Sequence, residues 1–291
     1  MHDGSTSRLD GQPVDAPIFA PDSWNLTEFE AALCAETRQL AQAKFAPRAA
    51  EIDREARFPT ENYADLKAHD LLGICIPAEH GGRGADLRAY MLAAAEIGRY
   101  CGATALTFNM HVSSCLWTGV LADGVDMSAA QRTEHAAMRA RHYKRILKDG
   151  AIYAQPFSEG GDAAAGKAAF GTTALRTDGG WIVNGRKIFA SLSGHADHYG
   201  VLCTELETAD SRPSRANTMY VAIQRDTPGV SVEGHWDPLG MRGTVSRTLI
   251  FKDVFIPCSE QLMPRGVYFN AARQWPHMFM TLTPSYMGIA Q

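Results

Sequence analysis

The sequence contains no run of about 20 apolar residues, so it offers no candidate transmembrane helix. The opening segment Met1–Asp15 is polar and rich in Gly, Ser and Asp, and it lacks the apolar core of a signal peptide. The net charge of −4 and the pI near 6.2 provide no broad positive field for a nucleic-acid backbone. These absences exclude a membrane span, disfavour a nucleic-acid partner and predict a cytoplasmic protein.

The sequence also lacks a C-x-x-C pair and any dense set of metal ligands. Its 6 cysteines are scattered along the chain, which predicts reduced thiols in the core rather than a disulfide framework. His195 and His198 lie three apart, but no further ligand lies near them in the sequence, and a zinc site needs three or four convergent ligands. We therefore expect no metal.

The chain is long enough for about two domains, and its composition is that of an ordinary packed protein, with 45% hydrophobic and 21% charged residues among 291. The pattern changes along its length. It predicts a flexible segment over residues 1–25, a helical domain over 26–149, a β domain over 150–264 and a further helical part over 265–291. The fold class expected is α+β.

Helical spacing of apolar residues begins near Leu26 and continues, with interruptions, to Lys148. The expected helical segments are about 29–45, 48–57, 60–72, 86–100, 104–121 and 128–148. The stretch Gly73–Gly84 contains Pro77 and several glycines, so it is expected to be a loop between helices.

After Gly150 the sequence favours short strands. The expected extended segments are 151–157, 172–177, 181–183, 199–204, 218–224, 229–233 and 248–254. Asp178–Gly180 and Asn184-Gly185 have the composition of tight turns between strands. Short strands with such turns predict an antiparallel barrel or sandwich.

The last part, from about Tyr268, is expected to be helical, with breaks at Pro276 and Pro284. No helix terminator is recognisable before Gln291. The sequence therefore indicates the first helical part of a truncated C-terminal domain.

Several segments follow one another in the order known from one enzyme family. They are Phe58-Pro59, Ile76–Gly84 (IPAEHGGRG), Phe157–Asp162 (FSEGGD), Gly180–Ser191 (GWIVNGRKIFAS), Pro238–Thr244 (PLGMRGT) and Phe251–Pro257 (FKDVFIP). Together they resemble the acyl-CoA dehydrogenase family over roughly residues 26 to 291. The resemblance implies a helical N-terminal domain, a middle β domain, the start of a helical C-terminal domain, and FAD as cofactor.

The resemblance also implies roles for individual residues. Ser191 matches the hydroxyl beside flavin N5, Phe189 matches the aromatic residue beside the flavin ring, and Phe157 and Ser158 lie in the first flavin loop. Taken alone, Ser191 and Ser158 would be ordinary turn serines and Phe189 a core aromatic. Gly160 replaces the usual proline of this loop, and Ala163–Gly171 reads as a longer connection, so the residue that holds the pyrophosphate stays open.

Three further residues are candidates for substrate contact. Met110 and His111 could line an acyl cavity, although a buried core histidine is the competing interpretation of His111. Arg242 could approach flavin or substrate, and a structural ion pair is its alternative. The glycines of 81–84 form neither G-x-G-x-x-G nor a Walker motif, and they are interpreted as a turn.

The activity implied by the resemblance is FAD-dependent α,β-dehydrogenation of an acyl-CoA or other acyl thioester, an EC 1.3 reaction. Implied partners are an electron-transferring flavoprotein or another electron acceptor, and a second copy of the chain in a homo-oligomer. The glutamate base of common family members lies in their C-terminal domain, and no carboxylate here is assigned that role, so we expect weak flavin binding and an incomplete enzyme. The alternatives are a flavin monooxygenase of the same fold and a non-catalytic chain completed by a partner.

Overall fold

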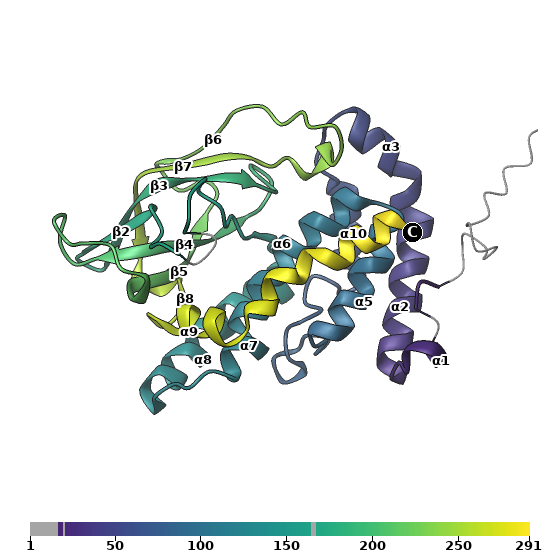
Figure 1. Cartoon of the computed structure of the whole chain (residues 1–291), viewed down its shortest axis with the longest axis horizontal. Coiled ribbons are helices and arrows are strands. Elements are labelled where there is room, and N and C mark those ends of the chain that lie inside the picture. The colour runs from purple at the N-terminus through teal and green to yellow at the C-terminus, as the bar shows by residue number, and fades with distance from the viewer. Residues whose placement is uncertain (1–16, 20, 164–166) are drawn as a thin grey trace, which may run out of the picture.

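The computed structural model of the protein describes residues 17–19, 21–163 and 167–291 (Figure 1). Most of the predicted flexible segment 1–25 lies outside these residues, as does part of the connection 163–171. Within the described residues, no helix is both long and apolar enough to cross a membrane.

Helices form the first half of the chain. Their bounds are α1 Pro21–Trp24, α2 Glu28–Leu40, the π-helical turn η1 Ala41–Phe45, α3 Ala46–Arg54, α4 Thr60–Ala68, the 3-10 turn η2 Ala78–His80, α5 Leu87–Gly98, α6 Gly102–Thr118, α7 Val120–Asp123, α8 Ala129–Lys144 and the π-helical turn η3 Arg145–Asp149. Sequence signals explain the ends: Thr27 with Glu30, and Ser128 with Gln131, form capping boxes at the starts of α2 and α8. The predicted loop at 73–84 holds only the short turn η2.

The second half is built on one sheet. Its strands are β1 Tyr153–Ala154, β2 Thr173–Thr177, β3 Gly180–Ala190, β4 His198–Leu206, β5 Thr218–Gln224, β6 Val230–Glu233, β7 Arg247–Pro257 and β8 Gln261–Met263, with 3-10 turns η4 Arg215–Asn217, η5 Arg242–Thr244 and η6 Cys258–Glu260. The order is β6-β7-β3-β2-β4-β5-β8, and β1 pairs with β4. Because the end strands β6 and β8 are not paired with each other, the sheet is open, and "barrel" was too strong a prediction.

Two further predictions about the sheet are corrected. The pairs β1–β4 and β2–β4 are parallel, so the sheet is mainly but not wholly antiparallel. Asn184-Gly185 is not a turn: it lies inside the long strand β3, which continues past a register shift between Val183 and Gly185. Glycine is needed here for a close approach, since a Cβ on Gly185 would lie 2.6 Å from Thr172 Cα, and the same residue pair is typical of hairpin turns.

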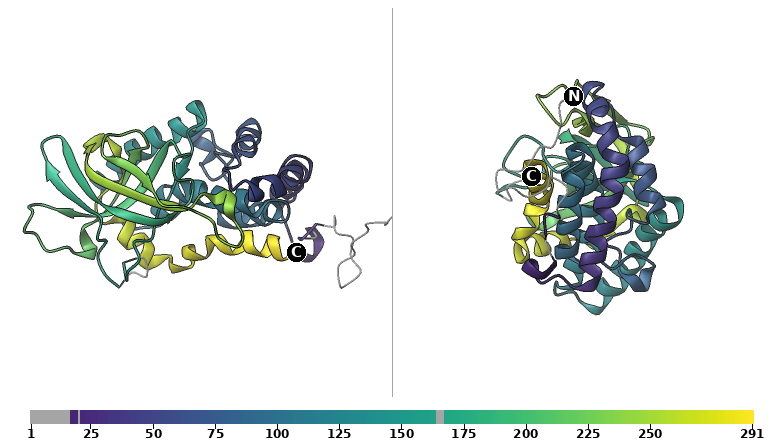
Figure 2. Two further views of the ribbon diagram at one scale, coloured as in Figure 1. Left: turned by 90° about the horizontal axis from the view of Figure 1, so that it is seen from above. Right: turned by 90° about the vertical axis from the view of Figure 1, so that its right-hand side faces the viewer.

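The chain then returns to the helical half through α9 Val267–Gln274, the 3-10 segment η7 Pro276–Leu282 and α10 Thr283–Ala290. Pro276 does break the helix, whereas Pro284 lies in the first turn of α10, where proline is tolerated. Figures 1 and 2 show α10 running along α5 and the sheet at the opposite end of the molecule. A Cβ on Gly288 would lie 2.1 Å from Ala95 O, so glycine permits this close helix crossing.

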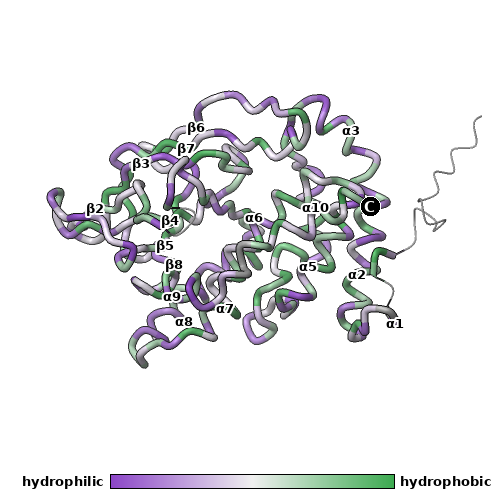
Figure 3. The backbone as a smooth tube through the Cα atoms, in the orientation of Figure 1, coloured by the Kyte–Doolittle hydropathy of each residue, from purple (hydrophilic) through white to green (hydrophobic). Residues whose placement is uncertain are grey.

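The core runs continuously through both halves of the molecule. Buried side chains of α5, α6 and the strands form one hydrophobic cluster, and Figure 3 shows the hydrophobic colour along α5 and hydrophilic colour on the long connection after β6. Ion pairs also join the halves: Arg145 at the end of α8 contacts both carboxylate oxygens of Glu260 at 2.6 and 2.7 Å. Of the cysteines, Cys258 alone is exposed, and the thiols are free.

Candidate functional site

The segment 188–190 leaves the regular sheet. A register shift between Lys187 and Ala190 interrupts the pairing of β3 with β7, and Phe189 lies in the left-handed region with φ 53°. Its ring is 66% exposed, which is unusual for a large aromatic side chain, and contacts Trp236 at a centroid distance of 6.3 Å. The bulge therefore presents an aromatic face to a potential ligand.

The two segments that the sequence assigned to the flavin lie next to each other. Ile188 N–H donates to Ser158 O at 2.9 Å, so the 157–160 loop pairs with the bulge beside Phe189. A Cβ on Gly160 would lie 3.1 Å from the Ile188 side chain. These segments are about 30 residues apart in the sequence, and the backbone contact brings them to one place.

A buried ion pair anchors the 157–160 loop from inside. Lys187 is fully buried, and its Nζ donates to Glu159 Oε1 and to Leu202 O, both at 2.7 Å. Glu159 also accepts from Gly171 N–H at 2.6 Å and Thr172 N–H at 3.0 Å. Burial lowers the pKa of Lys187; burial opposes ionisation of Glu159 as well, yet the ammonium holds the pKa of that carboxyl below its usual value.

Ser191 belongs to a short chain of hydroxyl groups. Its Oγ lies 2.7 Å from Ser246 Oγ, which lies 2.7 Å from Thr244 Oγ1, and Thr244 donates to Met241 O. Because Thr244 uses its proton on that carbonyl, Ser246 donates to Thr244 and Ser191 donates to Ser246. The Ser191 proton becomes available to another acceptor only if the direction of this chain reverses.

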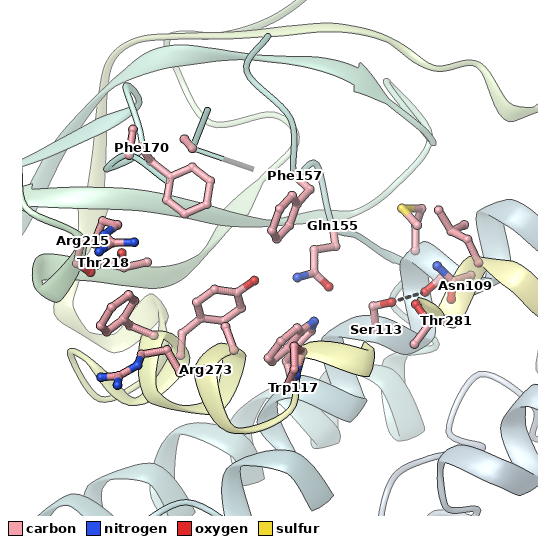
Figure 4. Close-up of a pocket in the computed structure, with 18 residues that line it drawn as sticks. Asn109, Ser113, Trp117, Gln155, Phe157, Phe170, Arg215, Thr218, Arg273 and Thr281 are labelled. Carbon is pink, nitrogen blue, oxygen red and sulfur yellow. Dashed lines mark hydrogen bonds between the residues drawn. The ribbon is translucent and has the colours of Figure 1, made fainter. Parts of the chain in front are cut away.

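A cavity of about 1040 Å³ lies between the helices and the sheet (Figure 4). Met110, Ser113 and Trp117 of α6 form one wall. The other walls come from the segment after β1, residues 163, 168 and 170, the start of β5 and the segment from α9 to Leu282, and they include Gln155, Phe157, Ala163, Phe170, Thr218, Tyr268, Phe269 and Leu282. Phe157 thus faces the cavity while the next residue, Ser158, is bonded to the Phe189 bulge.

The described lining of this cavity includes arginine, amide, hydroxyl and aromatic groups but neither aspartate nor glutamate. Arg215 and Arg273 lie at the ring of Phe269, with guanidinium carbons 5.7 and 5.8 Å from its centroid. The cavity therefore combines a mostly apolar interior with positive charge at one side, which suits a ligand with an apolar body and an anionic end.

The three predicted substrate residues lie in different surroundings in the structure. Met110 lines the cavity. His111 does not: it is fully buried, Tyr153 N–H donates to its Nδ1 at 3.0 Å, and its Nε2–H donates to Leu72 O at 2.9 Å. Both ring nitrogens are hydrogen-bonded to backbone groups of the core, which agrees with the interpretation of His111 as a buried core histidine.

Arg242 serves as a link between η5 and α3. Its Nε donates to Asp53 O and its terminal nitrogen donates to Asp53 Oδ2, both at 2.8 Å. The guanidinium therefore bonds a residue of the helical half of the chain, and Arg242 is absent from the described cavity lining. We assign it the structural ion-pair role.

Comparison with known proteins identifies the chain's relatives. The family model of the acyl-CoA dehydrogenase N-terminal domain matches residues 27–133, and that of the middle domain matches residues 157–254. The chain belongs to the acyl-CoA dehydrogenase family. It is 26% identical over 269 residues to the short-chain specific acyl-CoA dehydrogenase of Clostridium acetobutylicum, an alignment that covers 92% of this chain and 65% of the relative.

Solved structures of the acyl-CoA dehydrogenase fold agree. Butyryl-CoA dehydrogenase from Megasphaera elsdenii superposes with a TM-score of 0.71 at 23% identity, covering 91% of this chain and 65% of that one. FMN-bound TdsC from Paenibacillus sp. A11-2, a dibenzothiophene monooxygenase, superposes with a TM-score of 0.73 at 24% identity, covering 89% and 62%. The chain spans less than two thirds of the length of these proteins.

Some features of this acyl-CoA dehydrogenase family member were missed from the sequence. Lys187 lies on the same face of β3 as Trp181 and Val183, but the turn predicted at Asn184-Gly185 ended that strand at 183, so its inward position was not predicted. Gln155 was predicted to lie in the extended segment 151–157, but the observed strand β1 ends at Ala154, so strand periodicity does not explain its inward position. Tyr268 was noted only as the start of a helix.

Buried histidines in this acyl-CoA dehydrogenase family member make its stability depend on pH. Burial lowers the pKa of His111 to about 4 and that of His142 to about 3, below the unfolded value of about 6.5. The unfolded chain therefore binds more protons below pH about 6.5, so stability is full above that pH and is lost as the pH falls toward about 4. We expect the free energy of unfolding to fall by on the order of 2 to 4 kcal/mol between pH 7 and pH 5.

Urea unfolding at a series of pH values measures this effect. His142→Leu should flatten the pH dependence, whereas substitution of the exposed His235, as in His235→Gln, should leave it unchanged. A wild-type midpoint that stays constant from pH 7 to pH 5 would contradict the assignment.

Proposed function

We propose that this chain supplies the flavin wall and the acyl cavity of an FAD-dependent acyl-thioester α,β-dehydrogenase. The observation that carries the proposal is the hydrogen bond from Ile188 N–H to Ser158 O, because it joins the two family flavin segments beside the exposed ring of Phe189. Membership of the acyl-CoA dehydrogenase family and the acyl-CoA dehydrogenase of Clostridium acetobutylicum support it.

The residues at the bulge suit a flavin. Phe189 offers a flat apolar surface for the edge or face of an isoalloxazine ring. Ser191, only 7% exposed, would donate to flavin N5 when Ser246 donates to Ser191 in turn. When bound, FAD would supply a hydride acceptor; the protein's part is to hold it and to direct a hydrogen bond to its N5.

The cavity suits the acyl group of a thioester. Phe157 lines the cavity and Ser158 contacts the bulge, so adjacent residues connect the proposed acyl and flavin sites. Arg215 and Arg273 would attract the phosphates of CoA. Thioester dehydrogenation removes a proton from the α-carbon as hydride leaves the β-carbon, and the described lining offers no carboxylate to take that proton.

This arrangement predicts that the chain of 1–291 binds FAD weakly and does not oxidise thioesters. The reasons are that the described residues form one flavin wall and that the cavity lining lacks a carboxylate base. Titration with FAD followed by visible absorbance, and then a dye-reduction assay with butyryl-CoA and octanoyl-CoA, tests both parts. Stoichiometric FAD binding together with thioester oxidation would contradict the prediction that residues 1–291 alone are inactive. The absence of any flavin binding would reject the proposed function.

One observation favours a second candidate, a flavin monooxygenase. Oxygen insertion does not require a carboxylate that removes an α-proton, and the same fold serves the monooxygenase TdsC. Mass spectrometry of the products separates the two reactions when the chain is incubated with butyryl-CoA and oxidised flavin and, in parallel, with dibenzothiophene, reduced flavin and ¹⁸O₂. Label in the product indicates the monooxygenase, and an unlabelled enoyl thioester indicates the dehydrogenase.

A further inference from the structure

The amide of Gln155 has no partner in the protein although it is buried. The residue is 5% exposed, and neither its Oε1 nor its Nε2 has a hydrogen-bond partner among the described residues. Figure 4 shows its side chain directed into the cavity, toward Trp117. A buried amide without hydrogen-bond partners is destabilising, so such a group in a cavity points to a ligand that satisfies it.

Two other groups of the same cavity are also unsatisfied. Asn109 is fully buried and uses its Oδ1 to accept from Tyr90 O–H at 2.8 Å, while its Nδ2 has no partner among the described residues. The hydroxyl of Tyr268, a buried residue, has none either. The cavity therefore offers donors and one amide acceptor within an otherwise apolar lining.

The surrounding walls are aromatic. The rings of Trp117 and Tyr268 lie 4.6 Å apart, and those of Phe157 and Phe170 lie 5.9 Å apart at 88°. Aromatic walls of this kind interact with a planar ring through edge and face contacts, which a flexible alkyl chain cannot reproduce. A straight apolar chain would also leave the Gln155 amide unsatisfied.

We propose that the cavity binds a planar ring that carries a hydroxyl or carbonyl group, and that Gln155 is the residue that selects this polar substituent. The inference rests on the proposed function in one respect: the ring would be part of the acyl group of the thioester substrate. Gln155 acts in specificity, since it donates to and accepts from the substituent and takes no part in proton or hydride transfer.

Equilibrium dialysis of the full 291-residue chain against 2-naphthol and against naphthalene tests this, because the two probes differ by one hydroxyl. The measured quantity is the ratio of their affinities. Loss of one hydrogen bond to a neutral buried group should reduce this ratio roughly 3- to 10-fold in Gln155→Leu and in the similarly sized Gln155→Met. Naphthalene affinity should change less than the ratio does.

Met110→Leu is the matched control, since Met110 lines the same cavity without a polar atom that could bond the hydroxyl strongly. It should alter both affinities together and leave the ratio unchanged. Thermal melting of each variant shows that the fold is retained. An unchanged ratio in both Gln155 variants, or a wild-type chain that binds neither probe, would overturn the inference, and neither result would bear on flavin binding or thioester oxidation.

Discussion

Replacement of Lys187 by methionine is expected to lower the free energy of unfolding by about 3 to 5 kcal/mol. The ammonium is fully buried and bonds both Glu159 and Leu202 O. Its removal leaves the Glu159 carboxylate, whose side chain is 10% exposed, without its counter-charge, and the bonds from Gly171 and Thr172 N–H compensate only in part. Urea unfolding followed by circular dichroism measures the loss.

The expected loss of stability arises because the Glu159 carboxylate loses its counter-charge. A double variant that removes both charges tests this cause. Lys187→Met combined with Glu159→Leu should be less destabilised than Lys187→Met alone, because no uncompensated charge remains. Arg225→Met removes an ion pair with the exposed Asp226 and should cost less than about 1 kcal/mol. If Lys187→Met costs no more than Arg225→Met, the pair does not anchor the 157–160 loop.

Local sequence patterns were sufficient for most elements of the fold. The segment 218–224 was predicted as a strand and is β5, and the helix predicted to begin at 128 is α8, which Ser128 caps. Predictions were less accurate where the same residue types are common in two kinds of local structure. The pair Asn184-Gly185 is typical of a hairpin turn yet lies inside β3, and only the pairing of β3 with β7, about 70 residues later in the sequence, shows this.

The candidate site shows the same limit. The resemblance suggested Ser158 and Phe189 as flavin candidates, but the hydrogen bond that brings their segments together joins distant parts of the sequence, and no local pattern encodes it. His111 and Arg242 were reasonable candidates for substrate contact from their residue types. Their hydrogen-bond partners, Tyr153 N–H and Asp53, come from other elements and could not be predicted locally. Gln155 stands out only after the structure shows an amide without partners, which is a property of its surroundings and not of its residue type.

Phe189→Ala is expected to weaken FAD binding by roughly 10-fold or more while leaving the melting temperature within about 2 °C. These two effects separate because the ring is 66% exposed: its removal opens little of the core but deletes the aromatic face offered to the isoalloxazine ring. FAD titration at a fixed temperature, beside thermal melting of the apoprotein, measures both quantities.

Phe255→Ala provides the matched comparison, because Phe255 is an aromatic residue that is 45% exposed on β7, the strand that pairs with β3. Phe255 pairs with Ile182, several residues from the bulge, so its loss should leave FAD affinity unchanged. Equal weakening by both substitutions would mean that general disturbance of the sheet, and not the ring of Phe189, controls flavin binding. A selective loss in Phe189→Ala would locate the flavin wall at the bulge, where an exposed aromatic side chain lies next to the 157–160 loop.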